Sequence, residues 1–298
     1  MNKNNTIMRA ITTLNKGGIV IYPTDTAFGI GCRIDRPDAI KRLFQIRRRS
    51  VTQATPVLVS SISMAEEYLL SIPDLVREKL LARYWPGALT VVLPCKTDNV
   101  PELVRGGMGT LGVRMPNHPI ALKMIQQVGV PILGPSANFH GEKTPYSFEA
   151  LDPGLVQLVD YVLSGECAVK QASTVIDCSV NPWKTLRQGE ILLQKNILAI
   201  DTSDNKQITV SLEIDGKVHK KQQALDARRA QVVLPLIEEL LRKYSLTLQD
   251  LTEITVHPGP GSFTGLRVGI TIANTLAFLL KIPINGKKIG EYVEPCYT

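Results

Sequence analysis

Short hydrophobic runs alternate with amphipathic stretches along the first two thirds of the chain. The runs predict strands over residues 18–22, 55–59, 89–93, 111–115, 132–133, 174–177 and 191–193. The amphipathic stretches predict helices over residues 38–46, 64–70, 75–84 and 120–128, the first opened by Asp38 at a capping position. Strands that alternate with helices indicate the α/β class.

The pattern restarts near residue 196. It predicts strands over residues 197–201 and 208–214, a turn at Asp215-Gly216, a third strand, a helix over about 227–244, a strand over 254–257 and a helix over 264–280. A length of 298 residues suits two average domains better than one. We therefore expect two α/β domains, residues 1–195 and residues 196–298.

The composition is that of a soluble protein, with 44% hydrophobic and 20% charged residues. No stretch approaches the roughly 20 apolar residues of a membrane helix, and the start has no apolar signal core. Five cysteines without a Cys-x-x-Cys pair argue against a disulfide framework and a zinc site. We expect a cytoplasmic protein that does not contact the membrane.

The positive charge is concentrated in the first half. Residues 1–195 carry 22 Lys and Arg against 16 Asp and Glu, whereas residues 196–298 carry 12 against 11. Such an excess fits RNA, a phosphate-rich small ligand, or solubility alone.

Arginines in the first half follow predicted elements in a way that suits anion binding. Arg47 and Arg49 follow a predicted helix, Arg114 closes a strand and Arg187 precedes the last strand. Guanidinium groups grip phosphate or carboxylate in a bidentate manner. Taken singly, an arginine run is more often a solvated face, and a Ser-x-Asn such as Ser136 to Asn138 is more often a turn.

Taken in order, the motifs of the first half resemble the YrdC/TsaC family, the threonylcarbamoyl-AMP synthases of tRNA modification. The resemblance covers about residues 7–193 and rests on Pro23-Thr24-Asp25-Thr26, Arg47-x-Arg49, Trp85-Pro86-Gly87, Gly112-Val113-Arg114-x-Pro116, Pro135-Ser136-Ala137-Asn138, Ser173-Thr174-Val175 and Arg187-x-Gly189. It implies a twisted open α/β sheet around a concave cationic cavity. It also implies synthesis of threonylcarbamoyl-AMP from L-threonine, bicarbonate and ATP, with release of pyrophosphate.

The same resemblance implies roles for individual residues. Arg47 and Arg49 would act in catalysis. The residues around ATP would be Arg47, Arg49, Thr110, Ser136, Asn138, Thr144 and Arg187. Thr26, Arg114 and Ser173 would hold threonine, and Mg²⁺ would bridge the phosphates. The chain departs from the family at Arg47, where a lysine is usual, and at Phe28, where a tyrosine is usual.

The second half resembles TsaB, the non-catalytic subunit that pairs with the transferase TsaD. The resemblance rests on residues 198–203 and on the glycine loop 259–267. It implies a single actin-like (ribonuclease H-like) α/β lobe without the family's usual second lobe, which leaves a TsaB-like sequence in truncated form. The glycine loop suits either phosphate binding or a tight turn with close helix packing.

Two apolar helices in the second half predict a partner surface, because residues 268–280 carry no charge. The expected interface residues are Val232, Leu236, Leu240, Ile270, Ala273, Leu276 and Ala277. The alternative is that the first half or a second copy covers these helices.

The leading hypothesis is a fusion in tRNA threonylcarbamoyladenosine biosynthesis, with a synthase half and a half that docks a TsaD-like transferase. A TsaE-like ATPase and tRNA would join through the complex. One alternative is a catalytically weak RNA- or nucleotide-binding scaffold of the same pathway. Another is carbamoyl chemistry on a different acceptor, as in hydrogenase maturation, for which the chain lacks the accompanying segments.

Overall fold

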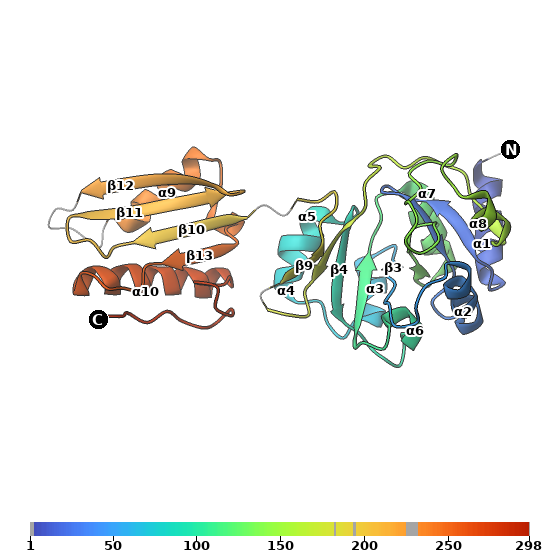
Figure 1. Ribbon diagram of the computed structural model, residues 1–298, viewed down its shortest axis with the longest axis horizontal. Coiled ribbons are helices and arrows are strands. Elements are labelled where there is room, and N and C mark those ends of the chain that lie inside the picture. Colours follow the sequence, from blue (N-terminus) through green and yellow to red (C-terminus); the bar gives the residue numbers. More distant parts are fainter. Residues whose placement is uncertain (1–2, 182, 193–194, 225–231, 298) are drawn as a thin grey trace. The chain divides into compact units, whose positions relative to one another are not determined.

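The computed structural model describes residues 3–181, 183–192, 195–224 and 232–297 (Figure 1). Contacts within the chain divide it into two units, Met1–Leu192 and Leu193–Thr298. Both units mix helices with twisted sheets, which confirms the predicted α/β class.

Two sheets form the frame of the first unit. The larger sheet has the spatial order β6-β3-β5-β4-β8-β9, and the smaller one has the order β2-β1-β7. The strands of the larger sheet are β3 (Val57–Leu58), β4 (Leu89–Pro94), β5 (Thr110–Arg114), β6 (Ile132–Leu133), β8 (Thr174–Asp177) and β9 (Lys184–Arg187). Those of the smaller sheet are β1 (Val20–Pro23), β2 (Phe28–Gly31) and β7 (Tyr161–Val162). All residues of β1 and β2 are buried, so this small sheet is covered on both faces.

Short helices cover these sheets. They are α1 (Lys3–Asn15), α2 (Pro37–Ile46), α3 (Ile62–Tyr68), α4 (Asp74–Val76), the π-turn η1 (Arg77–Leu81), α5 (Ala82–Tyr84), α6 (Glu102–Arg105), α7 (Pro119–Val128) and α8 (Pro153–Gln157). Ala10 and Leu14 of α1 and Met124 and Ile125 of α7 pack with Val20 of β1 in one hydrophobic cluster. Both α1 and α7 therefore cover β1, although the two helices are far apart in the sequence. They close the core over the strand that leads into the functional site described below.

Two predictions for the first unit are wrong in detail. Asp38 does not cap α2; the helix begins at Pro37, and its N-cap residue, Arg36, makes no side-chain cap hydrogen bond. Proline at the first helical position already has the required φ and has no N–H of its own, which favours a helix start at this residue. The strand predicted over residues 191–193 is absent at residues 191 and 192, and residue 193 lies outside the described residues.

The second unit is a four-stranded sheet with helices α9 and α10. Its elements are β10 (Asn196–Asp201), β11 (Gln207–Ile214), β12 (Lys217–Ala224), α9 (Val233–Lys243), η3 (Leu248–Asp250), β13 (Glu253–Val256) and α10 (Phe263–Leu280). The strand order is β12-β11-β10-β13, and β10 runs parallel to β13. The predicted helix start near residue 227 lies outside the described residues.

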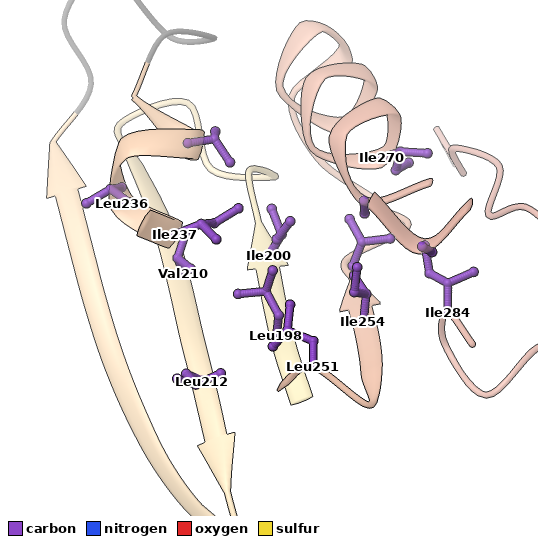
Figure 2. Packing of buried hydrophobic residues seen from close by; sticks show 14 of the residues in the cluster. Leu198, Ile200, Val210, Leu212, Leu236, Ile237, Leu251, Ile254, Ile270 and Ile284 are labelled. Atoms are coloured by element: carbon purple, nitrogen blue, oxygen red, sulfur yellow. The ribbon is translucent and has the colours of Figure 1, made fainter. Parts of the chain in front are cut away.

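Alternate residues of β10 are buried, and two of them, Leu198 and Ile200, share one cluster with Leu236 of α9 and Ile270 of α10 (Figure 2). Since alternate strand residues point to the same face, both helices cover one face of this sheet.

This packing overturns the predicted partner interface. Five of its seven residues are buried in the lobe's own cluster: Leu236, Leu240, Ile270, Ala273 and Ala277. Val232 and Leu276 are partly buried and pack against the same cluster. The apolar face that the sequence predicted as a partner surface instead packs both helices against their own sheet. The exposed hydrophobic side chains of α10 are Phe263, Phe278 and Leu279.

The glycine loop is explained by close packing. A Cβ on Gly259, whose φ is +128°, would lie 1.8 Å from the carbonyl oxygen of Cys296. A Cβ on Gly265 would lie 2.1 Å from the carbonyl oxygen of Thr202, and one on Gly269 would lie 2.2 Å from Thr202 Oγ1. These contacts favour the packing interpretation of the loop over the phosphate interpretation.

By length and composition alone, α10 could cross a membrane. This differs from the expectation that no stretch comes near the length of an apolar membrane helix. One such helix is weak evidence, because the core helix of a soluble protein passes the same test. The inner side of α10 packs in the hydrophobic cluster of the lobe, as Ile270 and Ala273 show. We therefore interpret α10 as a core helix of this α/β lobe.

The close approach of Thr202 to α10 gives a stability prediction. Gly269→Ala, which normally favours a helix, should destabilise the second unit by about 1–3 kcal/mol because the new methyl group overpacks against Thr202. Thr275→Ala, at an exposed position of the same helix, is the matched control and should not destabilise it. Hydrogen exchange of the β10 and β13 amides measures both, and equal protection in the two variants would contradict the packing.

Candidate functional site

A cavity of about 160 Å³ opens in the first unit, and it is strongly cationic. Four arginines line it: Arg47, Arg49, Arg114 and Arg187. Among the described residues that line the cavity there is no Asp or Glu. A concave site with four guanidinium groups and no lining carboxylate is suited to anionic ligands.

The turn between β1 and β2 forms one wall. Thr24 Oγ1 donates to the carbonyl oxygen of Ala27 at 2.7 Å and accepts from the backbone N–H of Thr26 at 3.2 Å. These local hydrogen bonds fix the turn and place Thr26 Oγ1 in the cavity. Thr26 Oγ1 in turn accepts from Arg114 Nη1 at 2.7 Å.

Arg114 stands at the end of β5 with its guanidinium held from three sides. Besides Thr26, its Nε donates to the carbonyl oxygen of Gly87 at 2.9 Å, and its Nη2 donates to Asp25 in a buried ion pair. Burial lowers the pKa of Arg114, and the carboxylate of Asp25 opposes that effect. This cation is therefore fixed in place and compensated by a carboxylate before any ligand binds.

Arg47 and Arg49 reach the cavity because the backbone reverses between them. Arg48 adopts a φ of +53°, is exposed and lies over the ring of Phe139 at 4.6 Å, while its two neighbours line the cavity. A left-handed residue at the end of α2 thus sends alternate side chains to opposite sides.

Arg47 is a buried cation that is only partly satisfied. It is 4% exposed, and its Nε and Nη2 donate to the backbone and side-chain oxygens of Asn138 at 3.1 and 3.2 Å. Its Nη1 is buried without a hydrogen-bond partner. Burial, together with the charge of Arg49, lowers the pKa of Arg47 to about 10. A free donor on a buried cation points to an anion as its missing partner.

The predicted Ser136 and Asn138 act differently from each other. Ser136 lines the cavity and donates to Asn138 Oδ1 at 2.6 Å, whereas Asn138 is not a lining residue. Asn138 donates to the carbonyl oxygen of Glu142 at 2.7 Å and accepts from Arg47. Asn138 therefore supports Arg47.

The far wall comes from β8 and β9. Arg187 donates from Nε to the carbonyl oxygen of Ser173 at 3.0 Å and from Nη2 to Ser173 Oγ at 2.9 Å. Ser173 Oγ lies 3.0 Å from Thr90 Oγ1, a lining residue that sequence reasoning missed. The signal for Thr90 was its place in β4 next to β8, which only the sheet order reveals.

The structure brings most predicted site residues of the first unit together; Asn138 and Thr110 are the two that do not line the cavity. Eight of them line the cavity: Thr26, Arg47, Arg49, Arg114, Ser136, Thr144, Ser173 and Arg187. Thr110 does not line it, because it begins β5 while Arg114 ends that strand, about 13 Å away at the rise of an extended chain. Phe28, which departs from the tyrosine that the resemblance implies, lines the cavity.

The cavity does not fit a resident Mg²⁺ site. Hard cations need oxygen ligands, usually carboxylates, and none lines it. In the part of the chain that the structure describes, no group of three or more His, Cys, Asp or Glu side chains is placed to hold a metal ion.

A loop before β8 carries Ala172 and Ser173 to the cavity, and His118 ties it down. His118 Nε2 lies 3.2 Å from the carbonyl oxygen of Glu166 in this loop, and Nδ1 accepts from the N–H of Ala121 at the start of α7. Both contacts together require the neutral ring with its proton on Nε2. Burial lowers the pKa of His118, in agreement with that requirement.

The fold and the cavity define an α/β protein with a buried cationic site for anionic ligands. Residues 12–189 match the Sua5/YciO/YrdC family model, described as telomere recombination. The chain belongs to the Sua5/YciO/YrdC family. Residues 224–286 match the TsaD model, described as tRNA N6-adenosine threonylcarbamoyltransferase.

Relatives of the first unit include threonylcarbamoyl-AMP synthases. A threonylcarbamoyl-AMP synthase of Bacillus subtilis is 34% identical over 189 residues, covering 62% of this chain and 54% of the relative. One of Xanthomonas campestris is 35% identical over 185 residues, covering 61% of this chain and 94% of the relative. The chain thus spans about half the length of the former.

The crystal structure of Pyrococcus abyssi Sua5 complexed with L-threonine is 23% identical, with a TM-score of 0.58 over 93% of this chain and 87% of that one. This likeness concerns the fold.

His118 gives a pH prediction. Its pKa is lower in the folded protein than in the unfolded chain, so the unfolded state takes up the proton first and stability falls as pH drops below about 6.5. His118→Asn keeps an acceptor for the start of α7 but does not titrate, and it should flatten this part of the stability profile. Thermal unfolding midpoints between pH 5 and 8 measure the difference, and parallel profiles would contradict the assignment.

Proposed function

We propose that the first unit is an L-threonylcarbamoyladenylate synthase that uses L-threonine, bicarbonate and ATP. The observation that carries this proposal is the buried Arg47, whose Nη1 has no partner in a cavity lined by three further arginines. The names of the relatives support the same activity. Such a cavity suits a reaction in which several anionic groups are held together.

Arg47 and Arg49 would take the phosphates. In the proposed reaction the amine of threonine captures carbon dioxide derived from bicarbonate as a carbamate, and a carbamate oxygen attacks the α-phosphorus of ATP. The bond from the α-phosphorus to the bridging oxygen breaks, and pyrophosphate leaves with the electron pair. Negative charge grows on the phosphate oxygens, where fixed guanidinium groups stabilise it without reorganisation. Ser136, Thr144 and Arg187 lie where they would add donors around ATP.

Arg114 would take the carboxylate of threonine. Its guanidinium is already oriented by Thr26, Gly87 and Asp25, so little side-chain freedom remains to be lost on binding. Ser173, held by Arg187, would be a second contact of the amino acid. Orientation of this kind brings the amine and the α-phosphorus together, which is where such a site gains most of its rate.

Mg²⁺ would enter with ATP as part of the substrate, because the cavity wall has no carboxylate to hold it. The cytoplasm is the expected compartment, since ATP, bicarbonate and tRNA meet there.

The second unit would dock a TsaD-like transferase that passes the threonylcarbamoyl group to tRNA, with a TsaE-like ATPase as a further member. The match of residues 224–286 to the TsaD model supports a link to that step. Since the inner residues of α10 are buried in the lobe, docking would use its exposed side. Phe278 and Leu279 are 59% and 68% exposed there.

The synthase proposal predicts pyrophosphate release that requires both L-threonine and bicarbonate. Arg49→Ala should lower kcat/KM at least tenfold, because it removes one of two phosphate-facing cations. Arg48→Ala, next in sequence but exposed and outside the cavity wall, is the matched control and should retain activity. Absence of release under every condition would contradict the enzyme and favour a binding scaffold.

The docking proposal predicts a change at Phe278. Phe278→Glu should weaken association with a TsaD-like transferase at least tenfold in sedimentation or titration, because it places a charge in an uncharged contact face. Val218→Glu on β12, at a side chain 64% exposed, is the control for added charge. Equal binding by both variants would show that the partner surface does not include Phe278 of α10.

A further inference from the structure

The four cavity arginines form two groups that differ in net charge. Arg47 and Arg49 form the first, and no ion pair in the described part of the chain neutralises either. Arg114 and Arg187 form the second, in which Asp25 pairs with Arg114. The first group therefore carries two uncompensated positive charges and the second carries one.

Asp25 reaches Arg114 from behind. Its side chain is buried and is not part of the cavity wall, so a ligand would meet the guanidinium but not the carboxylate. Its backbone carbonyl accepts from the N–H of Val169 at 2.8 Å, which fixes its position. Each terminal nitrogen of Arg114 donates one hydrogen to the protein, to Thr26 or to Asp25, and carries a second one. Those second hydrogens are the groups that a carboxylate could accept from.

The sign of the local charge decides which ligand prefers each end. A simple anion on Arg114 would lie a few ångströms from the carboxylate of Asp25 and would be repelled by it. An amino acid zwitterion brings a positive ammonium group with its carboxylate, so its net charge adds no such repulsion. A polyphosphate gains most at the end where two cations are uncompensated.

We propose that Asp25 is a specificity-determining residue, which reserves the Arg114 end of the cavity for a zwitterionic amino acid and directs phosphate groups to Arg47 and Arg49. The inference rests on the proposed function for the identity of the amino acid. Asp25 acts through Arg114 and touches neither ligand, so it is a positioning residue. Without its charge, Arg114 and Arg187 become a second dicationic site that phosphate can occupy.

Calorimetric titration of the full chain with three probes tests this assignment. The probes are L-threonine, 3-hydroxybutyrate (threonine without its amino group) and inorganic phosphate. Asp25→Asn keeps the shape and removes the charge, so the affinities for 3-hydroxybutyrate and phosphate should rise about tenfold relative to that for threonine. Asp35→Asn, at a carboxylate that pairs with Arg33 and is 42% exposed, should leave the ratios unchanged.

Asp25→Glu separates charge from position. It keeps the negative charge but moves it by one methylene group, so threonine binding should weaken while the ratio between threonine and 3-hydroxybutyrate stays near that of the native chain. If Asp25→Asn does not fold, Asp25→Glu still tests the assignment. A large fall in the ratio between the affinities for threonine and 3-hydroxybutyrate, although the charge is retained, would overturn it.

Unchanged ratios in a folded Asp25→Asn protein also overturn it. If the native chain binds phosphate but not threonine, the proposed function fails by itself. The phosphate probe then still tests Asp25, since phosphate binding that is no tighter in Asp25→Asn contradicts its role.

Discussion

The burial of Arg47 beside Arg49 is the constraint on which the rest of the cavity depends. Withdrawing a guanidinium from water costs several kcal/mol unless its donors find partners. The protein supplies two acceptors on Asn138 and leaves Nη1 without one. Asn138 is in turn held by Ser136 and Glu142, so a chain of hydrogen bonds keeps the cation in place. An anionic ligand would complete the set, which is why this residue carries the functional conclusion.

The remaining architecture serves to bring separate cations to one point. The turn after β1 holds Arg114 through Thr26 and Asp25, and the loop before β8 holds Arg187 through Ser173. The covered β1 and the sheet order place these segments together although they are far apart in sequence. Charge is compensated at Arg114 and left uncompensated at Arg47, so the cavity is cationic overall but not uniform. The second unit depends on a steric constraint instead, since its glycines have no side chain and so permit α10 to lie against Thr202.

Hydrophobic periodicity predicted most elements, because a buried strand and a packed helix leave different spacings in the sequence. Among the strands it missed β2, β7 and β9: β2 contains two glycines, β7 has only two residues, and β9 is exposed throughout. Eight residues that the resemblance implied line the cavity, but Thr110 and Thr90 show the limit of that reasoning. Thr110 shares a strand with Arg114 yet lies at its opposite end, and Thr90 reaches the cavity only because β4 pairs with β8. The interface prediction failed for a related reason, since an apolar helix such as α10 has the same sequence whether its face meets a partner or its own sheet.

A crystal structure of the chain with L-threonine and an ATP analogue that resists cleavage between the α- and β-phosphates tests the central claim most directly. The account predicts a phosphate oxygen within hydrogen-bond distance of Arg47 Nη1 and the carboxylate of threonine on Arg114. Phosphates on Arg114 and Arg187 instead, or ligands bound while Arg47 Nη1 still lacks a partner, would contradict it.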